Sequence, residues 1–537
     1  MRGQALIRRL APVALLWALV LLFACATLPL PFGRDQGIYA YTADRFLQGD
    51  ALYRDIYVFK PPLTVFVHAL AIALFGRSMT SIRELDVLWT LATATAIYAF
   101  VKLAWRDSRA VMASSWAAIA AGVSFAVFYH HTDYWNSAQT DGWANLPSVL
   151  GMLLLFVEQG RRRTARFAAG FLIGVAFLFK YTLGGLLPLA FVLLFLLRGP
   201  SAFRDAVALV WGFVASVVAL IVVMALDGGL MPFLHSQLEV LLPYAGAPKA
   251  GRNWGGATHT LWLMPDGLVE AALVGLGLAL VTLLARAVMG EPARRRESVA
   301  TFAVVGWTAS AAASVIVQGR FFPYHYLPLH APMALLVAYS ASRVLDFLPA
   351  RAQPWLAALA VAGLVGASVT DDPYPNRLAL VRKQLSDPTA FATGWEKGQY
   401  RNRDMALVDD QAMAAWLDQH TLPNERVFLW TYDPMIYFLA NRRLVSRFLY
   451  TYPLVVTWGP DAYDQELLYA LKATPPVVFV VGSHDATPPV MGHKLDSVGT
   501  FDRSGPLKEW VLENYEEVTI VNNRFHVYEQ KQPGVAP

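Results

Sequence analysis

Charged residues are scarce in this chain. Asp, Glu, Lys and Arg make up 15% of its 537 residues, against about 25% in an ordinary soluble protein, so a soluble globular fold for the whole chain is excluded. Cysteine is rarer still: Cys25 is the single cysteine, and no intrachain disulfide is possible. The sequence also lacks a P-loop, a GxGxxG after a strand and a GxSxG elbow. Nucleotide use therefore has no support in the sequence.

Long apolar runs are what the chain has instead. Hydrophobic residues make up 56% of it, and runs approaching the length of a membrane span recur until about residue 370 and then stop. We predict a polytopic α-helical membrane domain over residues 1–370, with about eleven spans. The first span ends near Leu30, and the others are expected at 84–104, 110–129, 142–158, 165–181, 183–197, 206–226, 267–287, 298–317, 326–345 and 354–370.

Basic residues indicate the orientation of these spans. Arg8, Arg9, Arg198 and Arg343 are among the basic residues in loops that the threading places on one side, as the positive-inside rule requires. The net charge of +5 is explained by this topology, and no nucleic-acid partner is expected. The N-terminus is expected in the cytoplasm, with no convincing cleavage site after the first span. The chain is thus predicted to be a multi-pass inner-membrane protein.

The composition changes after the last span. Helical patterns at 404–420, 433–441, 461–473 and 505–514 alternate with apolar runs at 426–430, 475–482 and 518–530. Such alternation is typical of a small α/β domain with a partly parallel sheet. Because the number of predicted spans is odd, we expect this domain, residues 371–537, in the periplasm.

The first outer loop, about residues 34–76, is the most informative segment. Asp35 stands at the exit of the first span, and Lys60 precedes two prolines and a second apolar run. That run, residues 63–75, is too short to cross a hydrocarbon core of ~30 Å at 1.5 Å per residue. We expect it to form a surface helix, with a second amphipathic surface helix at residues 36–48. The two helices would bracket Lys60.

Three residues of the outer surface could carry chemistry, although each has an ordinary structural interpretation. Asp35 could stabilise a helix N-terminus or act as a general base. Lys60 could reach from the interface towards water, or contact the phosphate of a lipid carrier. Asp141 begins a span and could be an N-cap, or a second carboxylate that orients an acceptor.

A second group of residues is expected to contact phosphate. Lys180 ends an otherwise apolar span, where an ionisable residue suggests function. Arg320, His325 and Tyr326 lie in one short outer loop, either as aromatic-belt anchors or as a recognition site for phosphate. The outer loop at 227–266 has the length and mixed polarity of a flexible substrate-binding loop, but no single residue in it stands out.

These residues together resemble the GT-C superfamily of polyprenyl-phosphate-sugar-dependent glycosyltransferases. The branch it resembles is that of bacterial relatives of protein mannosyltransferases and the lipid A aminoarabinose transferase. The resemblance covers nearly the whole chain and is most specific in the first outer loop. Its matches are Asp35, Ala43 to Gly49, Tyr53, Lys60 to Leu63, Leu74 to Gly76, Thr140 with Asp141, Gly174 with Lys180, and His325 with Tyr326 and Pro332.

The resemblance implies an inverting glycosyltransferase that moves a sugar from a polyprenyl-phosphate carrier to a hydroxyl of a lipid, glycan or protein. Asp35 would match the catalytic base, Lys60 the phosphate-contacting lysine and Asp141 the second acidic residue. No soluble cofactor is needed, and no metal is expected, since the adjacent His130 and His131 have poor geometry for one ion. Many members have Asp-Glu at the first motif where this chain has Asp35-Gln36, which puts a metal-binding or base-assisting role at that position in doubt.

Two alternative functions remain open at this point. A transporter or flippase for a lipid-linked saccharide could use the same phosphate-binding loop without chemistry, although broken spans in corresponding halves are not evident. An O-antigen ligase or polymerase would also act on a polyprenyl carrier. Such an enzyme centres on a long later periplasmic loop, for which residues 227–266 are a candidate.

Overall fold

The computed structural model divides into two compact units. It describes residues 2–108, 110–158, 162–246, 258–261, 264–265, 267–290, 295–387, 401–402, 405–457, 459–460 and 462–531. The first unit comprises residues 1–30, 80–220 and 253–382, and the second comprises residues 31–79, 221–252 and 383–537. Each unit therefore collects segments that lie far apart in the sequence.

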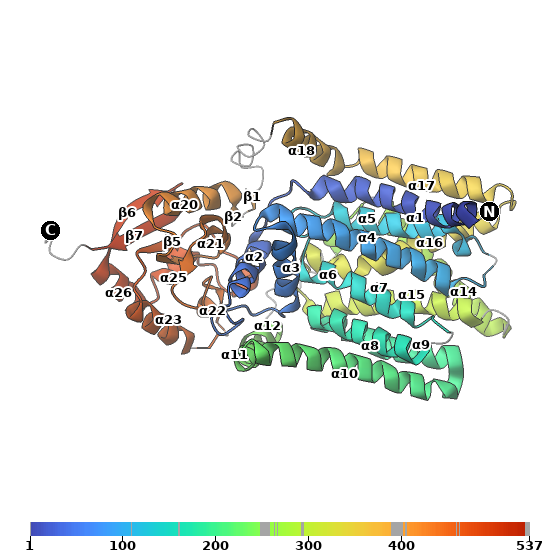
Figure 1. Cartoon of the computed structure of the whole chain (residues 1–537), viewed down its shortest axis with the longest axis horizontal. Coiled ribbons are helices and arrows are strands. Elements are labelled where there is room, and N and C mark those ends of the chain that lie inside the picture. Colours follow the sequence, from blue (N-terminus) through green and yellow to red (C-terminus); the bar gives the residue numbers. More distant parts are fainter. Residues whose placement is uncertain are drawn as a thin grey trace. The chain divides into compact units, whose positions relative to one another are not determined.

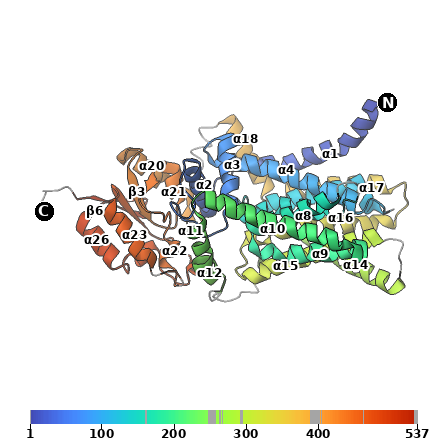
Figure 2. The ribbon, with the colours of Figure 1, turned by 60° about the horizontal axis from the view of Figure 1, so that its bottom comes forward.

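The first unit is a helical bundle, whose long helices run largely along a common direction in Figures 1 and 2. Its helices are α1 (Arg2–Ala24), α4 (Met79–Ala104), α5 (Ser115–His131), α6 (Thr140–Trp143), α7 (Asn145–Leu154), α8 (Arg162–Phe179), α9 (Leu186–Arg198), α10 (Phe203–Leu226, ending in the second unit), α14 (Leu268–Met289), α15 (Arg295–Gln318), α16 (His330–Asp346) and α17 (Gln353–Thr370). The 3₁₀ segments η3 (Tyr181–Gly185) and η7 (Pro323–Leu329) belong to the same unit, and α18 (Tyr374–Ser386) follows α17.

Six segments of the described chain are long and apolar enough to cross a membrane. They are Leu10–Thr27, Met79–Ala104, Tyr181–Leu226, Leu268–Met289, Arg296–Gln318 and Gln353–Thr370. The segment Tyr181–Leu226 contains both α9 and α10. The remaining predicted spans are occupied by α5, α7, α8 and α16, which are not both long and apolar enough to be counted among the six. A polytopic helical membrane domain is thus confirmed, whereas the number of eleven spans is not.

Small residues let the helices of this unit approach one another closely. A Cβ atom on Gly170 of α8 would collide with the backbone carbonyl of Leu209 in α10, and one on Gly275 of α14 with that of Leu336 in α16. Close backbone approach at small residues is the usual way in which helices associate in lipid. Trp211 on α10 and Leu284 on α14 are exposed apolar side chains, as lipid-facing positions require.

Two short helices open the second unit. α2 spans Arg34–Leu47 and α3 spans Leu63–Phe75, at the positions that the sequence predicts for surface helices. They pack against each other, and the rings of Phe46 and Phe66 lie 5.4 Å apart. The unit also contains α11 (Leu230–His235), the π-helical turn η5 (Ser236–Leu241) and α12 (Leu242–Gly246).

The rest of the second unit is an α/β domain, here taken as residues 405–531. Its five-stranded sheet has the order β4-β3-β5-β7-β6, in which β3 pairs in parallel with β4 and β5, while β7 pairs antiparallel with β5 and β6. The strands are β3 (Arg426–Trp430), β4 (Arg443–Leu444), β5 (Val478–Gly482), β6 (Tyr515–Val521) and β7 (Phe525–Gln530), and β1 (Arg401–Asn402) pairs separately with β2 (Met405–Ala406). The predicted partly parallel sheet is confirmed.

Helices cover both faces of this sheet. Figure 1 shows α20 (Leu407–His420) and α21 (Met435–Ala440) on one side and α23 (Ala462–Ala473) and α26 (Pro506–Asn514) on the other. The shorter helices are α22 (Tyr452–Val455), α24 (Pro488–Met491) and α25 (Ser497–Phe501). The run at 518–530, predicted as one segment, is a hairpin that turns at Asn522 and Asn523. Their φ angles of 49° and 52° lie in the left-handed region, which asparagine tolerates.

Candidate functional site

The first turn of α2 carries the predicted base. Asp35 is the second residue of the helix, where the partial positive charge of the helix N-terminus favours a carboxylate. Gln36 is fully buried, and its side-chain oxygen accepts a hydrogen bond of 2.9 Å from the backbone amide of Gly33. The glutamine that departs from the Asp-Glu pattern therefore holds the start of the helix.

Asp35 and Lys60 form an ion pair within the second unit. The ammonium Nζ of Lys60 lies 3.0 Å from Oδ2 of Asp35, and the side chains are 17% (Asp35) and 22% (Lys60) exposed. The same ammonium lies 5.3 Å from the ring centroid of Tyr39. The pair is thus packed against an aromatic side chain yet keeps access to solvent, as a group that meets a ligand requires.

The chain between the two surface helices is held in a defined shape. Tyr53 has a φ angle of 65°, a strained value for a residue with a bulky side chain. Its hydroxyl donates a hydrogen bond of 2.7 Å to the carbonyl of Lys60. The ring of Phe59 stacks on Tyr452 at 5.1 Å, and the amide of Tyr57 donates to the carbonyl of Arg447. Lys60 is therefore positioned through contacts with the α/β domain.

α2 itself packs against α21 of the α/β domain. A Cβ atom on Gly37 would lie 2.8 Å from the Cβ of Met435, so the two helices approach at a position where only glycine fits. One turn further on, the ring of Tyr41 stacks on Tyr437 at 5.2 Å, and its hydroxyl donates to the carbonyl of Arg442 at 2.9 Å. The helix that carries Asp35 is therefore built into the α/β domain.

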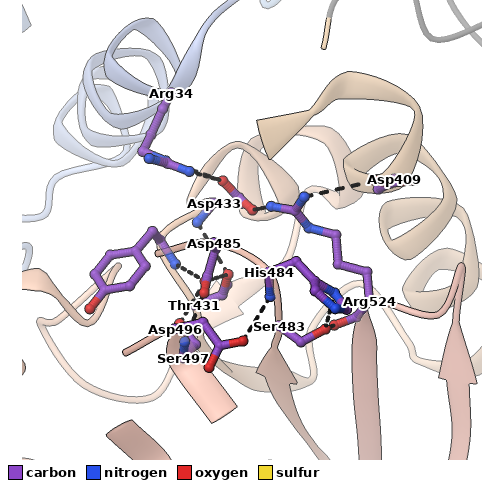
Figure 3. A network of polar contacts seen from close by, with 11 residues as sticks. Arg34, Asp409, Thr431, Asp433, Ser483, His484, Asp485, Asp496, Ser497 and Arg524 are labelled. Atoms are coloured by element: carbon purple, nitrogen blue, oxygen red, sulfur yellow. Dashed lines mark hydrogen bonds and ion pairs between the residues drawn. The ribbon is translucent and has the colours of Figure 1, made fainter. Parts of the chain in front are cut away.

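A buried charge network, shown in Figure 3, begins at the residue before Asp35. Arg34 donates from Nε and Nη2 to Oδ1 of Asp433, at 3.2 and 3.0 Å. The other oxygen of Asp433 accepts from Nη2 of Arg524 at 2.6 Å, and Arg524 also lies 3.8 Å from Asp409. Asp433 has no exposed surface. None of these four residues is marked by its local sequence, because only folding brings them together.

Two further carboxyl groups of this network are buried. Burial, followed by the negative charge of Asp433, raises the pKa of Asp410 well above its ordinary value. Within the described residues, neither side-chain oxygen of Asp410 has a hydrogen-bond partner. The same two causes raise the pKa of Asp485, although Ser497 donates to it from both its hydroxyl and its amide. The network thus favours a protonated carboxyl at Asp410.

The first unit holds a second ion pair. Nζ of Lys180 lies 3.0 Å from Oδ2 of Asp141, whose side chain is almost fully buried. The ammonium also lies 6.0 Å from the ring centroid of Tyr324, whose ring contacts His325 at 4.6 Å. α6, which carries Asp141, packs against η7, which carries His325 and Tyr326. The structure thus gathers these predicted residues around one buried pair.

The remaining predicted positions are placed as follows. His325 and Tyr326 are buried, at 4% and 3% exposure, whereas Arg320 is half-buried in the turn between α15 and η7. In the loop 227–266, α11, η5 and α12 are described, and residues 247–257, 262, 263 and 266 lie outside the described residues. The described part of the chain contains no group of three His, Cys, Asp or Glu side chains that could hold a metal ion.

Comparison with known families gives one match. Residues 59–226 match the family model of dolichyl-phosphate-mannose-protein mannosyltransferases. The matched segment begins just before Lys60 and includes Asp141 and Lys180. A comparison of the sequence with curated proteins finds no match.

Solved structures share the fold over the length of the chain. ArnT from Cupriavidus metallidurans bound to undecaprenyl phosphate is 15% identical with a TM-score of 0.55, over 98% of this chain and 99% of ArnT. The apo state of the same protein gives 16% identity and a TM-score of 0.53, over 98% of each chain.

A third structure is the archaeal oligosaccharyltransferase AglB from Archaeoglobus fulgidus, solved with an inhibitory peptide and a dolichol-phosphate. It is 12% identical with a TM-score of 0.50, over 99% of this chain and 75% of AglB. At these identities the likeness is one of fold. Together with the family match, it confirms the resemblance to the GT-C glycosyltransferases that the first outer loop indicates.

Proposed function

We propose that this protein is an inverting glycosyltransferase that transfers a sugar from a polyprenyl-phosphate carrier to a hydroxyl acceptor, on the extracytoplasmic side of the inner membrane. Residues 1–370 would form the catalytic membrane domain, and residues 371–537 the periplasmic domain. The observation that carries the proposal is the ion pair between Asp35, at the start of α2, and Lys60, 3.0 Å apart and about one fifth exposed. The fold adds support, because relatives with this fold are solved with undecaprenyl phosphate and dolichol-phosphate.

Lys60 would hold the phosphate of the donor. Its ammonium group has three donors, so it can contact the Asp35 carboxylate and a phosphate oxygen at the same time. As the bond between the anomeric carbon and the phosphate oxygen breaks, the phosphate keeps the electron pair and gains negative charge. A cation placed beside that oxygen stabilises the transition state more than the bound substrate, which is how it would raise the rate.

Asp35 would be the general base. It accepts the proton of the acceptor hydroxyl while the hydroxyl oxygen forms the new bond to the anomeric carbon, opposite the departing phosphate. The geometry is that of an inverting glycosidase, with an alcohol in place of water.

The second ion pair is proposed to take part in the reaction as well. We propose that Asp141 orients the acceptor or assists the base, while Lys180 pairs with its nearly buried carboxylate. Arg320, His325 and Tyr326 would contribute to the phosphate site. No soluble cofactor or metal takes part in this scheme.

The test is the release of polyprenyl phosphate from a panel of polyprenyl-phosphate sugars in proteoliposomes, with a membrane extract as the source of acceptor. Wild type is compared with Asp35→Asn and with Asp502→Asn, an exposed carboxylate of the same unit. Release by wild type and Asp502→Asn, but not by Asp35→Asn, supports the proposal. Release that persists in Asp35→Asn removes this residue as the base. Binding or movement of the lipid without release supports the transporter instead.

A further inference from the structure

A cavity of about 400 Å³ in the second unit is lined by an unusual number of arginines. It is bordered by β3, β4, α23, the end of α2 and the chain that follows α2. Its arginines are Arg45, Arg54, Arg426, Arg443 and Arg447. The volume is that of a pocket for a small ligand, and the transfer scheme above uses none of these residues.

Three of the five arginines have carboxylate partners. Arg45 pairs with Asp50 at 2.6 Å, Arg54 with Asp55 at 2.7 Å and Arg447 with Glu466 at 2.6 Å. These three acids also line the cavity. The paired arginines therefore contribute no net positive charge to it.

Arg426 and Arg443 are different. They are Cα partners on the neighbouring parallel strands β3 and β4, and both are exposed. Within the described residues, neither takes part in an ion pair. Like charges side by side on adjacent strands are unfavourable. Five arginines against three carboxylates leave two positive charges facing one cavity, which suits an anion that carries up to two negative charges.

The rest of the lining indicates what the anion is attached to. Leu444, Val445 and Ala470 are the only apolar residues of the lining within the described chain, so there is no trough for an acyl chain. The three carboxylates have lone pairs left to accept hydrogen bonds from hydroxyl groups. Guanidinium groups bind phosphate and carboxylate oxygens in pairs.

We propose that this cavity binds an anionic saccharide, a sugar that bears a phosphate or a carboxylate group. Arg426 and Arg443 bind the anionic group, and the carboxylates of the paired residues accept hydrogen bonds from the sugar hydroxyls. The proposal goes beyond the transfer reaction, because it predicts binding of a saccharide to the cavity, and that binding can be measured without any sugar transfer.

The cavity is connected to the candidate functional site. Nη1 of Arg447 donates a hydrogen bond of 3.0 Å to the carbonyl of Tyr53, and the hydroxyl of Tyr53 donates to the carbonyl of Lys60. One residue with a strained backbone therefore contacts both a wall of the cavity and the lysine. A saccharide that binds here lies on the segment that positions Lys60.

The experiment is calorimetric titration of the full-length protein in detergent with glucose 6-phosphate, glucuronate, glucose and inorganic phosphate. The double variant Arg426→Gln/Arg443→Gln is compared with Arg503→Gln, an exposed arginine of the same unit that does not line the cavity. We expect wild type and Arg503→Gln to bind the two anionic sugars. Each cavity substitution should weaken binding roughly tenfold, and the double variant roughly 100-fold, because each removes a charge-assisted hydrogen bond.

Four results would overturn the proposal: equal affinity of the double variant and Arg503→Gln, equal binding of glucose and glucose 6-phosphate, binding of inorganic phosphate as tight as that of the sugar phosphate, and displacement of the sugar by phosphatidylglycerol added to the detergent. The last would identify a lipid headgroup as the ligand. Thermal unfolding checks that each variant folds. If the double variant does not fold, the affinity of the single variant Arg443→Gln, at an exposed position of the edge strand β4, tests the proposal instead.

Discussion

Arg34 and Asp35 follow each other at the start of α2, yet their side chains belong to two different charge clusters. Arg34 reaches into a network in which Asp433 is fully buried and Arg524 is 8% exposed. Asp35 pairs with Lys60 at a position where about a fifth of each side chain is exposed. A fully buried charge that loses its partner is costly, whereas a pair that keeps access to solvent costs less to break. The first cluster therefore serves the structure, and the second remains available for chemistry.

The network also explains how the available pair is held in place. The guanidinium of Arg34 and the carboxylate of Asp35 are on adjacent residues, so fixing the first limits where the second can point. Asp433 holds Arg34 from one side and Arg524 holds Asp433 from the other. A catalytic carboxylate needs this support, because a small displacement of a reacting group lowers the reaction rate strongly.

The substitution Asp35→Asn should have the largest effect on activity. It keeps the shape of the side chain but removes the proton acceptor, so we expect the rate of polyprenyl-phosphate release to fall by roughly 10²–10⁴-fold. Stability should change by less than about 1 kcal/mol, since the pair is partly exposed. Release assays and thermal unfolding of the same preparation measure both quantities. A large loss of stability in this variant would show that the comparison between the two clusters is wrong.

Asp433→Asn should chiefly reduce stability, in contrast to Asp35→Asn, which should chiefly reduce activity. It leaves Arg34 and Arg524 without their shared buried carboxylate, and we expect a loss of about 3–5 kcal/mol in the free energy of unfolding. Denaturation of the purified protein in detergent measures the loss. The exposed Asp502→Asn, which breaks only a surface pair with Lys508, is the matched control and should cost less than about 1 kcal/mol. Equal stability of the two variants would contradict a structural role for the network.

Lys60→Met should affect donor binding. It removes the cation but keeps a long unbranched side chain, so we expect KM for the donor to rise by roughly 10- to 150-fold through the loss of a charged hydrogen bond. We expect kcat to fall as well, because the cation also stabilises the charge that develops on the phosphate. Initial rates over a range of donor concentrations separate KM from kcat. Lys508→Met serves as the surface control. An unchanged KM with a reduced kcat would show that Lys60 does not hold the phosphate in the bound donor.

Asp410→Asn should have the smallest effect, visible only as a change in pH dependence. The pKa of Asp410 is raised in the folded protein, chiefly by burial, whereas in the unfolded chain it stays near about 3.9. At pH values between the unfolded-state pKa and the raised folded-state pKa, the folded protein binds one more proton than the unfolded chain. The free energy of unfolding of the wild type should therefore fall as pH rises above about 4. The variant should lack this contribution. Unfolding temperatures measured from pH 4 to pH 8 compare the slopes, and parallel curves for the two proteins would refute the prediction.

The sequence predicted those features that depend on local pattern. Long apolar runs identified the membrane domain, and the short run after Lys60 predicted a surface helix where α3 lies. Alternating runs predicted the partly parallel sheet of the α/β domain. The hairpin turn at Asn522 and Asn523 was not predicted, although two adjacent asparagines are a turn signal that could have revealed it.

The candidate site was predicted in its residues but not in its contacts. Asp35 and Lys60 stood out because charged residues are conspicuous beside apolar runs, and their contact joins positions only 25 apart. Arg34, Asp433 and Arg524 were not predicted, since each is ordinary in its local sequence. The bond between Arg34 and Asp433 joins positions 399 apart.

By itself the sequence determined the polytopic helical domain, the α/β domain, the resemblance to the GT-C glycosyltransferases, the acid in the first surface helix and the lysine that precedes the second. The length of hydrophobic runs and the position of charges beside them are local properties, which can be read directly from the sequence. Only the tertiary structure decided that Gln36 holds a helix start, that Asp433 anchors Arg34, and that Arg426 and Arg443 share one cavity. Those facts arise when distant segments pack together, and long-range packing leaves no periodic mark in the sequence.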